Sequence, residues 1–187
     1  MILLGIQSSP NVNGLTAQLA QAVLAGAESE SAKITEIHLN QMKIYACKAC
    51  NLDKRGWGTC RSDGKCSLKD DFQDLREKIH QADAVVFATP VYFGDLSESM
   101  KCFLDRWRRC EREAPNQDRL KHKPVVGIAA AGGRGGGAIN ALRNLETYLR
   151  WFGFAIFDLV PVTKYSKTHK IDMLNAIGKK LATRNLG

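Results

Sequence analysis

Residues 84–90, AVVFATP, decide the fold. Five apolar residues in a row, closed by Thr89-Pro90, are typical of a strand that is buried on both faces of a parallel sheet and then ends in a loop. Toward the N-terminus residues 1–7 repeat this pattern, and toward the C-terminus residues 125–131 do so again. These runs predict three strands, each of which leads into a loop.

Between and beyond these strands, apolar residues recur at helical spacing. The segments with this spacing are residues 14–26, 70–82, 97–109, 138–149 and 171–182. Residues 33–39 and 154–162 predict two further strands. Because right-handed crossovers place helices on both faces of a parallel sheet, we expect an α/β fold, namely a doubly wound five-stranded parallel sheet. With no internal repeat, residues 1–187 are expected to form a single domain.

Composition narrows the classes of function. The chain has 27 Lys and Arg against 19 Asp and Glu, so its formal charge of +8 favours anionic partners. No apolar stretch is long enough to span a membrane and no signal peptide is recognisable, which predicts a cytoplasmic protein with no membrane partner. The basic residues are spread over helices without a groove-reading helix, which argues against nucleic acid.

Ligands of such sheets bind beyond the carboxyl ends of the strands, so the loops at those ends are candidate sites. The first loop offers hydroxyls from Ser9 and Thr16 and amides from Asn11 and Asn13, beside backbone N–H groups at a helix start. This chemistry suits a phosphate, because a helix N-terminus carries partial positive charge and unsatisfied donors. An ordinary helix cap would use the same residue types.

The loops after the third and fourth strands are the other candidate ligand-binding loops at the carboxyl ends of the strands. The third strand is followed by Tyr92 and Phe93, against which a planar ring could lie, although both could instead pack under a helix. The fourth strand is followed by residues 132–137, GGRGGG, where backbone can approach a ligand closely because no Cβ intervenes. Arg134 in this loop could hold a phosphate or simply be solvated.

Three segments together resemble the flavodoxin-like NADPH-dependent FMN reductases and the related iron–sulfur flavoproteins. The segments are Ser9-Pro10 with Gly14 and Thr16, residues 88–94 (ATPVYFG), and residues 100–106 (MKCFLDR). The resemblance covers nearly the whole chain and implies a flavodoxin-like, FMN-binding domain. The residues that it implies for FMN are Ser9, Asn11, Asn13, Gly14, Leu15 and Thr16 around the phosphate, Pro90, Val91, Tyr92, Phe93 and Gly94 along the isoalloxazine, and Gly132, Gly133 and Gly135 at its other edge.

A cysteine-rich loop at about residues 45–69 interrupts the regular pattern. It contains Cys47-x2-Cys50-x9-Cys60-x5-Cys66, at the place where the iron–sulfur flavoproteins carry a cluster with tighter cysteine spacing. Four thiolates could ligate [4Fe–4S], or zinc in a structural site, or they could remain free thiols. A disulfide scaffold is not expected in a chain of this size in a reducing compartment.

These features lead to three hypotheses of function. The first is an oxidoreductase that passes electrons from NAD(P)H through FMN to a small-molecule or redox-protein acceptor, with no catalytic side chain because the flavin carries the chemistry. The second is an iron–sulfur flavoprotein that acts as an electron carrier with a [4Fe–4S] cluster, and the third is a zinc-stabilised, non-enzymatic binding module. A homo-oligomer is expected, with Trp107 and Trp151 as candidate surface residues.

Overall fold

The computed structural model describes residues 1–50, 57–111 and 118–183. Along the chain the elements are β1 (Ile2–Gln7), α1 (Leu15–Glu28), β2 (Lys33–His38), the 3-10 helix η1 (Leu39–Gln41), α2 (Thr59–Ser62), α3 (Phe72–Gln81), β3 (Ala84–Pro90), α4 (Glu98–Glu111), β4 (Pro124–Ala131), α5 (Ala138–Trp151), β5 (Ala155–Thr163) and α6 (Lys167–Thr183). The expected strands and long helices are all present. The short helix α2 lies in a stretch for which the sequence predicted only loop, and η1 begins at Leu39, the last residue of the predicted strand at residues 33–39.

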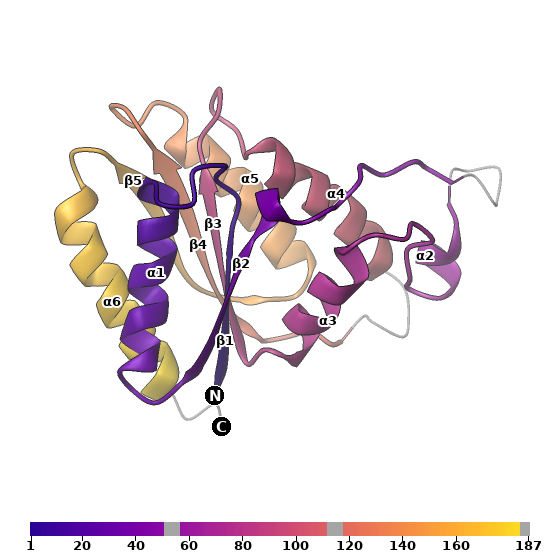
Figure 1. Cartoon of the computed structure of the whole chain (residues 1–187), viewed down its shortest axis with the longest axis horizontal. Helices are drawn as coiled ribbons and strands as arrows, with labels where there is room; N and C mark the ends of the chain where they lie inside the picture. Colours follow the sequence, from indigo (N-terminus) through magenta and orange to yellow (C-terminus); the bar gives the residue numbers. More distant parts are fainter. Residues whose placement is uncertain (51–56, 112–117, 184–187) are drawn as a thin grey trace.

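The strands form one five-stranded sheet in the order β2-β1-β3-β4-β5, and every pair is parallel (Figure 1). This is the flavodoxin-like order, so the predicted fold class is confirmed. Every residue of β3 is buried, as the unbroken apolar run of this strand predicted. Because the strand order reverses between β1 and β3, the loops that follow these strands diverge and leave room for a ligand at that edge.

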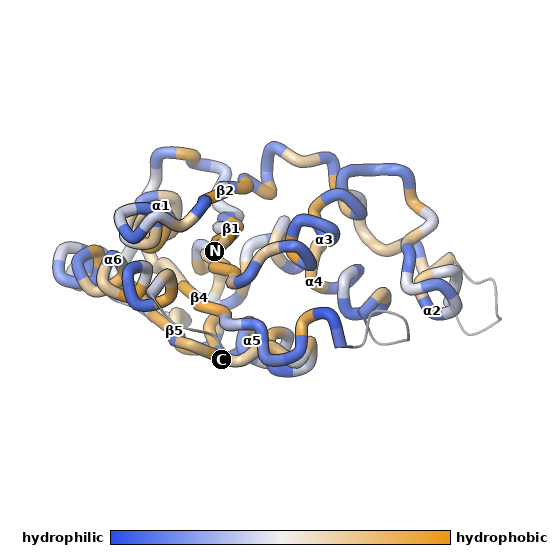
Figure 2. The backbone as a smooth tube through the Cα atoms, turned by 90° about the horizontal axis from the view of Figure 1, so that it is seen from below, coloured by the Kyte–Doolittle hydropathy of each residue, from blue (hydrophilic) through white to orange (hydrophobic). Residues whose placement is uncertain are grey.

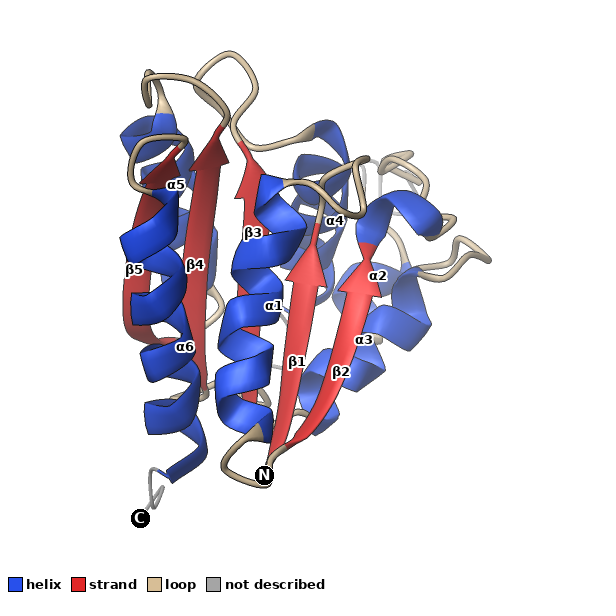
Figure 3. Ribbon diagram, turned by 60° about the vertical axis from the view of Figure 1, so that its left-hand side comes forward, coloured by secondary structure: helices blue, strands red, loops and turns tan. Residues whose placement is uncertain are grey.

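Helices cover both faces of the sheet, with α1 and α6 on one side and α3, α4 and α5 on the other (Figure 3). Neighbouring side chains of a strand alternate between the two cores: Leu3 packs with α1 and α6, whereas Leu4 packs with α3 and α4. In Figure 2 the strands are mostly orange and the outer parts of the chain mostly blue. Among the helices of the described residues, none is long and apolar enough to cross a membrane.

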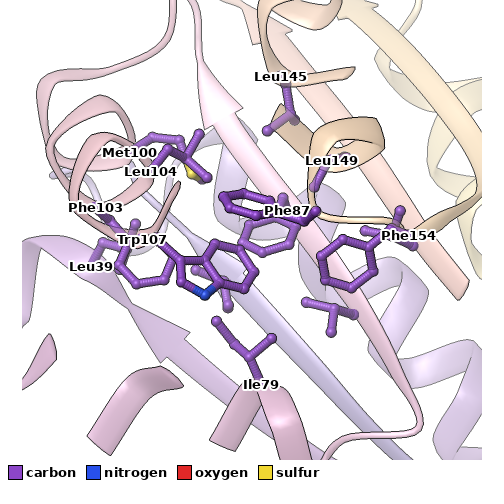
Figure 4. Packing of buried hydrophobic residues seen from close by; sticks show 14 of the residues in the cluster. Leu39, Ile79, Phe87, Met100, Phe103, Leu104, Trp107, Leu145, Leu149 and Phe154 are labelled. Atoms are coloured by element: carbon purple, nitrogen blue, oxygen red, sulfur yellow. The ribbon is translucent and has the colours of Figure 1, made fainter. Parts of the chain in front are cut away.

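An aromatic cluster fills the core under α4 (Figure 4). The indole of Trp107 is fully buried, with ring centroids 4.1 Å from Phe152, 5.1 Å from Phe103 and 6.0 Å from Phe87. The expectation that Trp107 helps to form an oligomer surface is therefore wrong, because its helical position points inward. Trp151, the other candidate, is 48% exposed.

Helices α1 and α6 pack unusually closely on the opposite face. A Cβ built on Gly26 would lie 2.0 Å from the carbonyl oxygen of Asn175, and one built on Gly178 would lie 2.0 Å from that of Val23. Only glycine permits this approach, through which α1 packs directly on α6, the last helix.

Candidate functional site

The loops that follow β1, β3 and β4 lie at one edge of the sheet, as the strand directions require (Figures 1 and 3). Direct contacts join them. The hydroxyl of Ser97, at the end of the second loop, donates to the hydroxyl of Ser8 in the first loop at 2.7 Å. Gly137, at the end of the third loop, packs so tightly on the second that a Cβ there would lie 2.3 Å from the Cα of Gly94. The three predicted segments thus meet.

The first loop is shaped by hydrogen bonds from its own backbone N–H groups. Ser9 N–H donates to Gln7 Oε1 at 2.7 Å, Asn11 N–H to Ser9 Oγ at 3.2 Å, and Asn13 N–H to Asn11 Oδ1 at 3.2 Å. The loop ends at Gly14, the N-cap of α1, which provides no side-chain cap, and the first turn of α1 contains no acidic residue. The helix therefore presents uncapped N–H groups, which favours an anion at this end.

The predicted phosphate-loop residues differ in exposure. Thr16 is only 3% exposed, while the side chain of Leu15 packs on the apolar cluster between α1 and α6. Leu15 can therefore contribute only its backbone N–H to a phosphate. Ser9 is also buried, whereas Asn11 and Asn13 are exposed.

The second loop is a tight turn. Tyr92 and Asp95 exchange two backbone hydrogen bonds of 3.0 Å, and between them Phe93 and Gly94 have φ angles of 52° and 80°. The Asp95 carboxylate also accepts from Asn144 Nδ2 of α5 at 2.8 Å. The turn is firmly anchored, yet the Phe93 side chain is fully exposed at 111%. Phe93 and Tyr92 do not pack under a helix, the alternative that the sequence left open.

The glycine loop combines open space with one close contact. A Cβ built on Gly132, Gly133 or Gly136 would meet nothing within 4 Å. Gly135, in contrast, has a φ of 96°, and a Cβ there would lie 2.6 Å from Thr163 Cγ2 at the end of β5. Substitution would therefore be strained at Gly135, while Gly132 and Gly133 leave the adjoining space free for a planar ligand.

A buried polar network behind these loops was not predicted. Ser97 N–H donates to Thr89 Oγ1 at 3.1 Å, and the Ser8 carbonyl oxygen accepts from Asn40 Nδ2 at 2.6 Å and from Ser99 Oγ at 3.2 Å. It joins the loops after β1 and β3 to η1 and to the start of α4. The sequence places serine and threonine residues at the strand ends, but it does not show which of these side chains form hydrogen bonds with one another.

The chain matches the family described as NADPH-dependent FMN reductase over residues 1–163. An iron–sulfur flavoprotein of Archaeoglobus fulgidus is 32% identical over 148 residues, which cover 79% of this chain and 68% of that relative. The chain belongs to the FMN reductase family. Another iron–sulfur flavoprotein of this organism is 32% identical over 106 residues, 57% of this chain, which span only 45% of that longer relative.

Solved structures bear out the fold of this FMN reductase family member. An archaeal flavodoxin superposes with a TM-score of 0.63 at 14% sequence identity, and the match covers 97% of this chain and 96% of the flavodoxin. At this identity the likeness concerns the fold alone. The family, in turn, is one that depends on FMN. At the ends of the strands this chain presents an uncapped helix N-terminus at α1 and open space beside Gly132 and Gly133.

A second candidate site lies at the cysteine-rich loop. Cys47, Cys50, Cys60 and Cys66 line one pocket, together with Arg106, Arg109 and Cys110 of α4. All six cysteines of the chain are free thiols, and within the described residues no group of three or more His, Cys, Asp or Glu side chains is arranged to hold a metal ion. The four thiols therefore converge on a pocket without forming a ligand set, so their role as metal ligands stays a prediction.

Arg106 connects this pocket to the core. Its side chain is 1% exposed and donates two hydrogen bonds to the fully buried Asp70 carboxylate, at 2.5 and 3.1 Å. It also donates to Cys66 Sγ at 3.2 Å and to the Tyr45 carbonyl oxygen at 2.8 Å. Burial is the largest single influence and would raise the pKa of the Asp70 carboxyl, but the hydrogen bond and the charge of Arg106 and the backbone N–H groups of Tyr45 and Phe72 together outweigh it and hold this pKa below its usual range.

Cys110 of α4 lies in the same pocket. It is 1% exposed, and burial raises the pKa of its thiol to about 12. The spacing of the first four cysteines gave no sign of this neighbour, because Cys110 lies 44 residues beyond Cys66 in the sequence. The other helical cysteine, Cys102, is half-buried, with its sulfur 3.8 Å from the Ile44 carbonyl oxygen.

Proposed function

We propose that the protein is an oxidoreductase that binds FMN at the edge formed by the loops after β1, β3 and β4, and that it transfers electrons from NAD(P)H to a small acceptor. The observation that carries this proposal is the meeting of these loops through Ser8 with Ser97 and Gly94 with Gly137. Family membership supplies the identity of the cofactor. The bound flavin would accept a hydride equivalent and pass electrons on.

The chain's own residues would bind and orient this cofactor. The uncapped backbone N–H groups of the first turn of α1, which begins at Leu15, would hold the phosphate, with the Ser9 hydroxyl beside them. The turn at Tyr92 and Phe93 would bound one edge of the ring, and Gly132 and Gly133 the other. Asp95 accepts a hydrogen bond from Asn144, and Gly94 packs closely on Gly137. The distance between the turn at Tyr92 and Phe93 and the glycine loop is therefore fixed.

Replacing Gly14 tests the phosphate site. Gly14 has an extended backbone, with φ of −76° and ψ of −178°, which any residue can adopt, but a Cβ there would lie 3.0 Å from Asn11 Cγ. Gly14→Asp therefore requires the exposed Asn11 side chain to shift, and it then caps α1 while placing a negative charge at the phosphate site. We expect FMN affinity to fall by about ten-fold or more. Gly14→Asn is the matched control, because it has the same size and capping ability without the charge.

Fluorescence titration with FMN and with riboflavin measures the effect. Wild-type protein should prefer FMN, and Gly14→Asp should reduce this preference more than Gly14→Asn does. Equal affinities of the wild type for FMN and riboflavin would contradict the proposed phosphate site. Absence of NADH or NADPH oxidation by FMN-loaded protein, with any acceptor tried, would contradict the proposed reaction.

A second candidate function is that of an electron carrier with a metal cluster. It is favoured by the pocket that Cys47, Cys50, Cys60 and Cys66 share, and by relatives that are named iron–sulfur flavoproteins. Arg106 and Arg109 line the pocket and would offset the negative charge of a thiolate-ligated group. Analysis of iron, acid-labile sulfide and zinc in anaerobically purified protein distinguishes cluster, zinc and free thiols.

The oligomeric state and the cellular location of the protein are also part of this proposal. A homo-oligomer remains the expectation, with the exposed Trp151 as one surface residue, and sedimentation of dilute protein as a monomer would contradict it. A cytoplasmic location likewise stays a prediction.

A further inference from the structure

A basic, aromatic surface adjoins the glycine loop and has no role in the proposed binding of FMN. It is formed by the segment that joins β5 to α6, residues 163–167, together with Arg134. Lys164 N–H donates to the Gly133 carbonyl oxygen at 3.4 Å, and Gly135 packs on Thr163 as described above. The two loops lie side by side beyond the ends of β4 and β5 (Figure 3).

The β5–α6 segment holds its aromatic side chain outward. Thr163 Oγ1 accepts the backbone N–H groups of Tyr165 and Ser166, both at 3.2 Å, which fixes the turn. The Tyr165 ring is nevertheless 67% exposed, and Lys164 Nζ lies 5.0 Å from its centroid. The turn is fixed, and its largely exposed aromatic ring, with the Lys164 ammonium over it, offers area on which a planar ligand can stack.

The surface is positively charged throughout. Residues 132–144 and 163–171 contain no Asp or Glu, whereas they carry Arg134, Arg143, Lys164, Lys167 and Lys170. The first turn of α6 contains no acidic residue either. Lys170 is not part of the surface, since its side chain donates to the Pro161 carbonyl oxygen and is partly buried.

From these observations we infer that Tyr165, Lys164 and Arg134 bind the adenosine-phosphate end of a pyridine nucleotide, with the adenine stacked on Tyr165 and a phosphate held by the two cations. Exposed aromatic rings stack readily on bases, and Lys and Arg pair with phosphates. This inference rests on the proposed function, in which the nicotinamide end of the same molecule meets the flavin. The surface borders the glycine wall of that site, so one extended ligand would reach both.

Adenosine 2′,5′-bisphosphate is a suitable probe, because it carries the adenine and the phosphate but no nicotinamide. Its affinity for FMN-loaded protein would be measured by calorimetry for the wild type, Lys164→Glu, Tyr165→Ala and Tyr165→Phe. We expect Lys164→Glu to weaken binding by about ten-fold or more and Tyr165→Ala by about five-fold, while Tyr165→Phe keeps it. Lys179→Glu, an exposed change in the last turns of α6, is the matched charge control and should have little effect.

Two outcomes would overturn the inference while leaving the FMN site intact. One is an unchanged affinity for the bisphosphate in Lys164→Glu, or no binding to the wild type, in protein that binds FMN normally. The other is equal weakening by Lys164→Glu and Lys179→Glu, which would indicate attraction by overall charge. Failure of the wild type to bind FMN would instead remove the proposed function and this inference together.

Discussion

At Arg106 the chain places a permanent charge in its interior. The guanidinium lies beside the cysteine pocket and pairs with a carboxylate, Asp70, that is equally buried. Removing one partner of such a pair leaves the other charge without compensation, which costs far more stability than an exposed pair contributes. The pair also positions Cys66 and Tyr45, so its loss would loosen the cysteine-rich loop.

Asp70→Asn should lower the free energy of unfolding at pH 7 by about 3 kcal/mol. Because the pKa of Asp70 is lower in the folded than in the unfolded protein, its contribution is present above the unfolded pKa of about 4 and is lost as pH falls through the folded value. The difference between variant and wild type should therefore shrink below about pH 4, as measured by urea unfolding at several pH values. Asp118→Asn, in an exposed pair with Lys121, is the control. A difference that stays constant down to pH 2 would contradict this account.

Phe93 combines full exposure with a left-handed backbone, a conformation that suits Asn far better than Phe. Phe93→Asn should therefore raise the free energy of unfolding by about 0.5–1 kcal/mol. Tyr92→Asn, two positions before Gly94 in the same turn, should give no such gain, because Tyr92 has no positive φ. Thermal unfolding of the FMN-free protein measures both, and a destabilised Phe93→Asn would show that the ring makes contacts that stabilise the fold.

At the scale of elements, the contact between α1 and α6 depends on two glycines. Gly178→Ala should destabilise the protein by about 2 kcal/mol, because the added Cβ would overlap the Val23 carbonyl oxygen. The expected sign is informative, since alanine is otherwise favoured over glycine inside a helix by about 1 kcal/mol. Gly133→Ala, where the added Cβ meets nothing, is the control for stability. Chemical unfolding of both variants tests this, and a stabilised Gly178→Ala would mean that α6 can move away from α1 at little cost.

The elements themselves could be predicted from the sequence because their signals are local. The unbroken apolar run at residues 84–88 and the helical spacing at residues 97–109 both gave the right element. The short helix α2 could not be predicted in this way, because four residues carry no periodicity and their conformation depends on packing against α4. The same limit applied to the site: the loops were located correctly, but the pairing of Ser8 with Ser97 joins residues 89 positions apart.

At the scale of the whole molecule, binding of FMN should stabilise the fold, because the proposed site consists of the loops after β1, β3 and β4, which are brought together only in the folded chain. At a free FMN concentration one hundred times the Kd, the free energy of unfolding should rise by about 2.7 kcal/mol. Riboflavin at the same concentration should stabilise less if the phosphate is held at α1. Calorimetric melting with each ligand provides the measurement, and equal shifts would argue that the phosphate is not bound.

Helix α4 links the two candidate sites of the molecule. The chain enters it from Ser97, in the network behind the proposed flavin site, and its C-terminal half carries Arg106 and Cys110 at the cysteine pocket. With 14 residues, each adding about 1.5 Å, the helix is about 20 Å long. If both sites hold redox groups, the length of α4 sets the distance that an electron must travel between them. A helical turn inserted into or deleted from α4 would then change the rate of internal electron transfer.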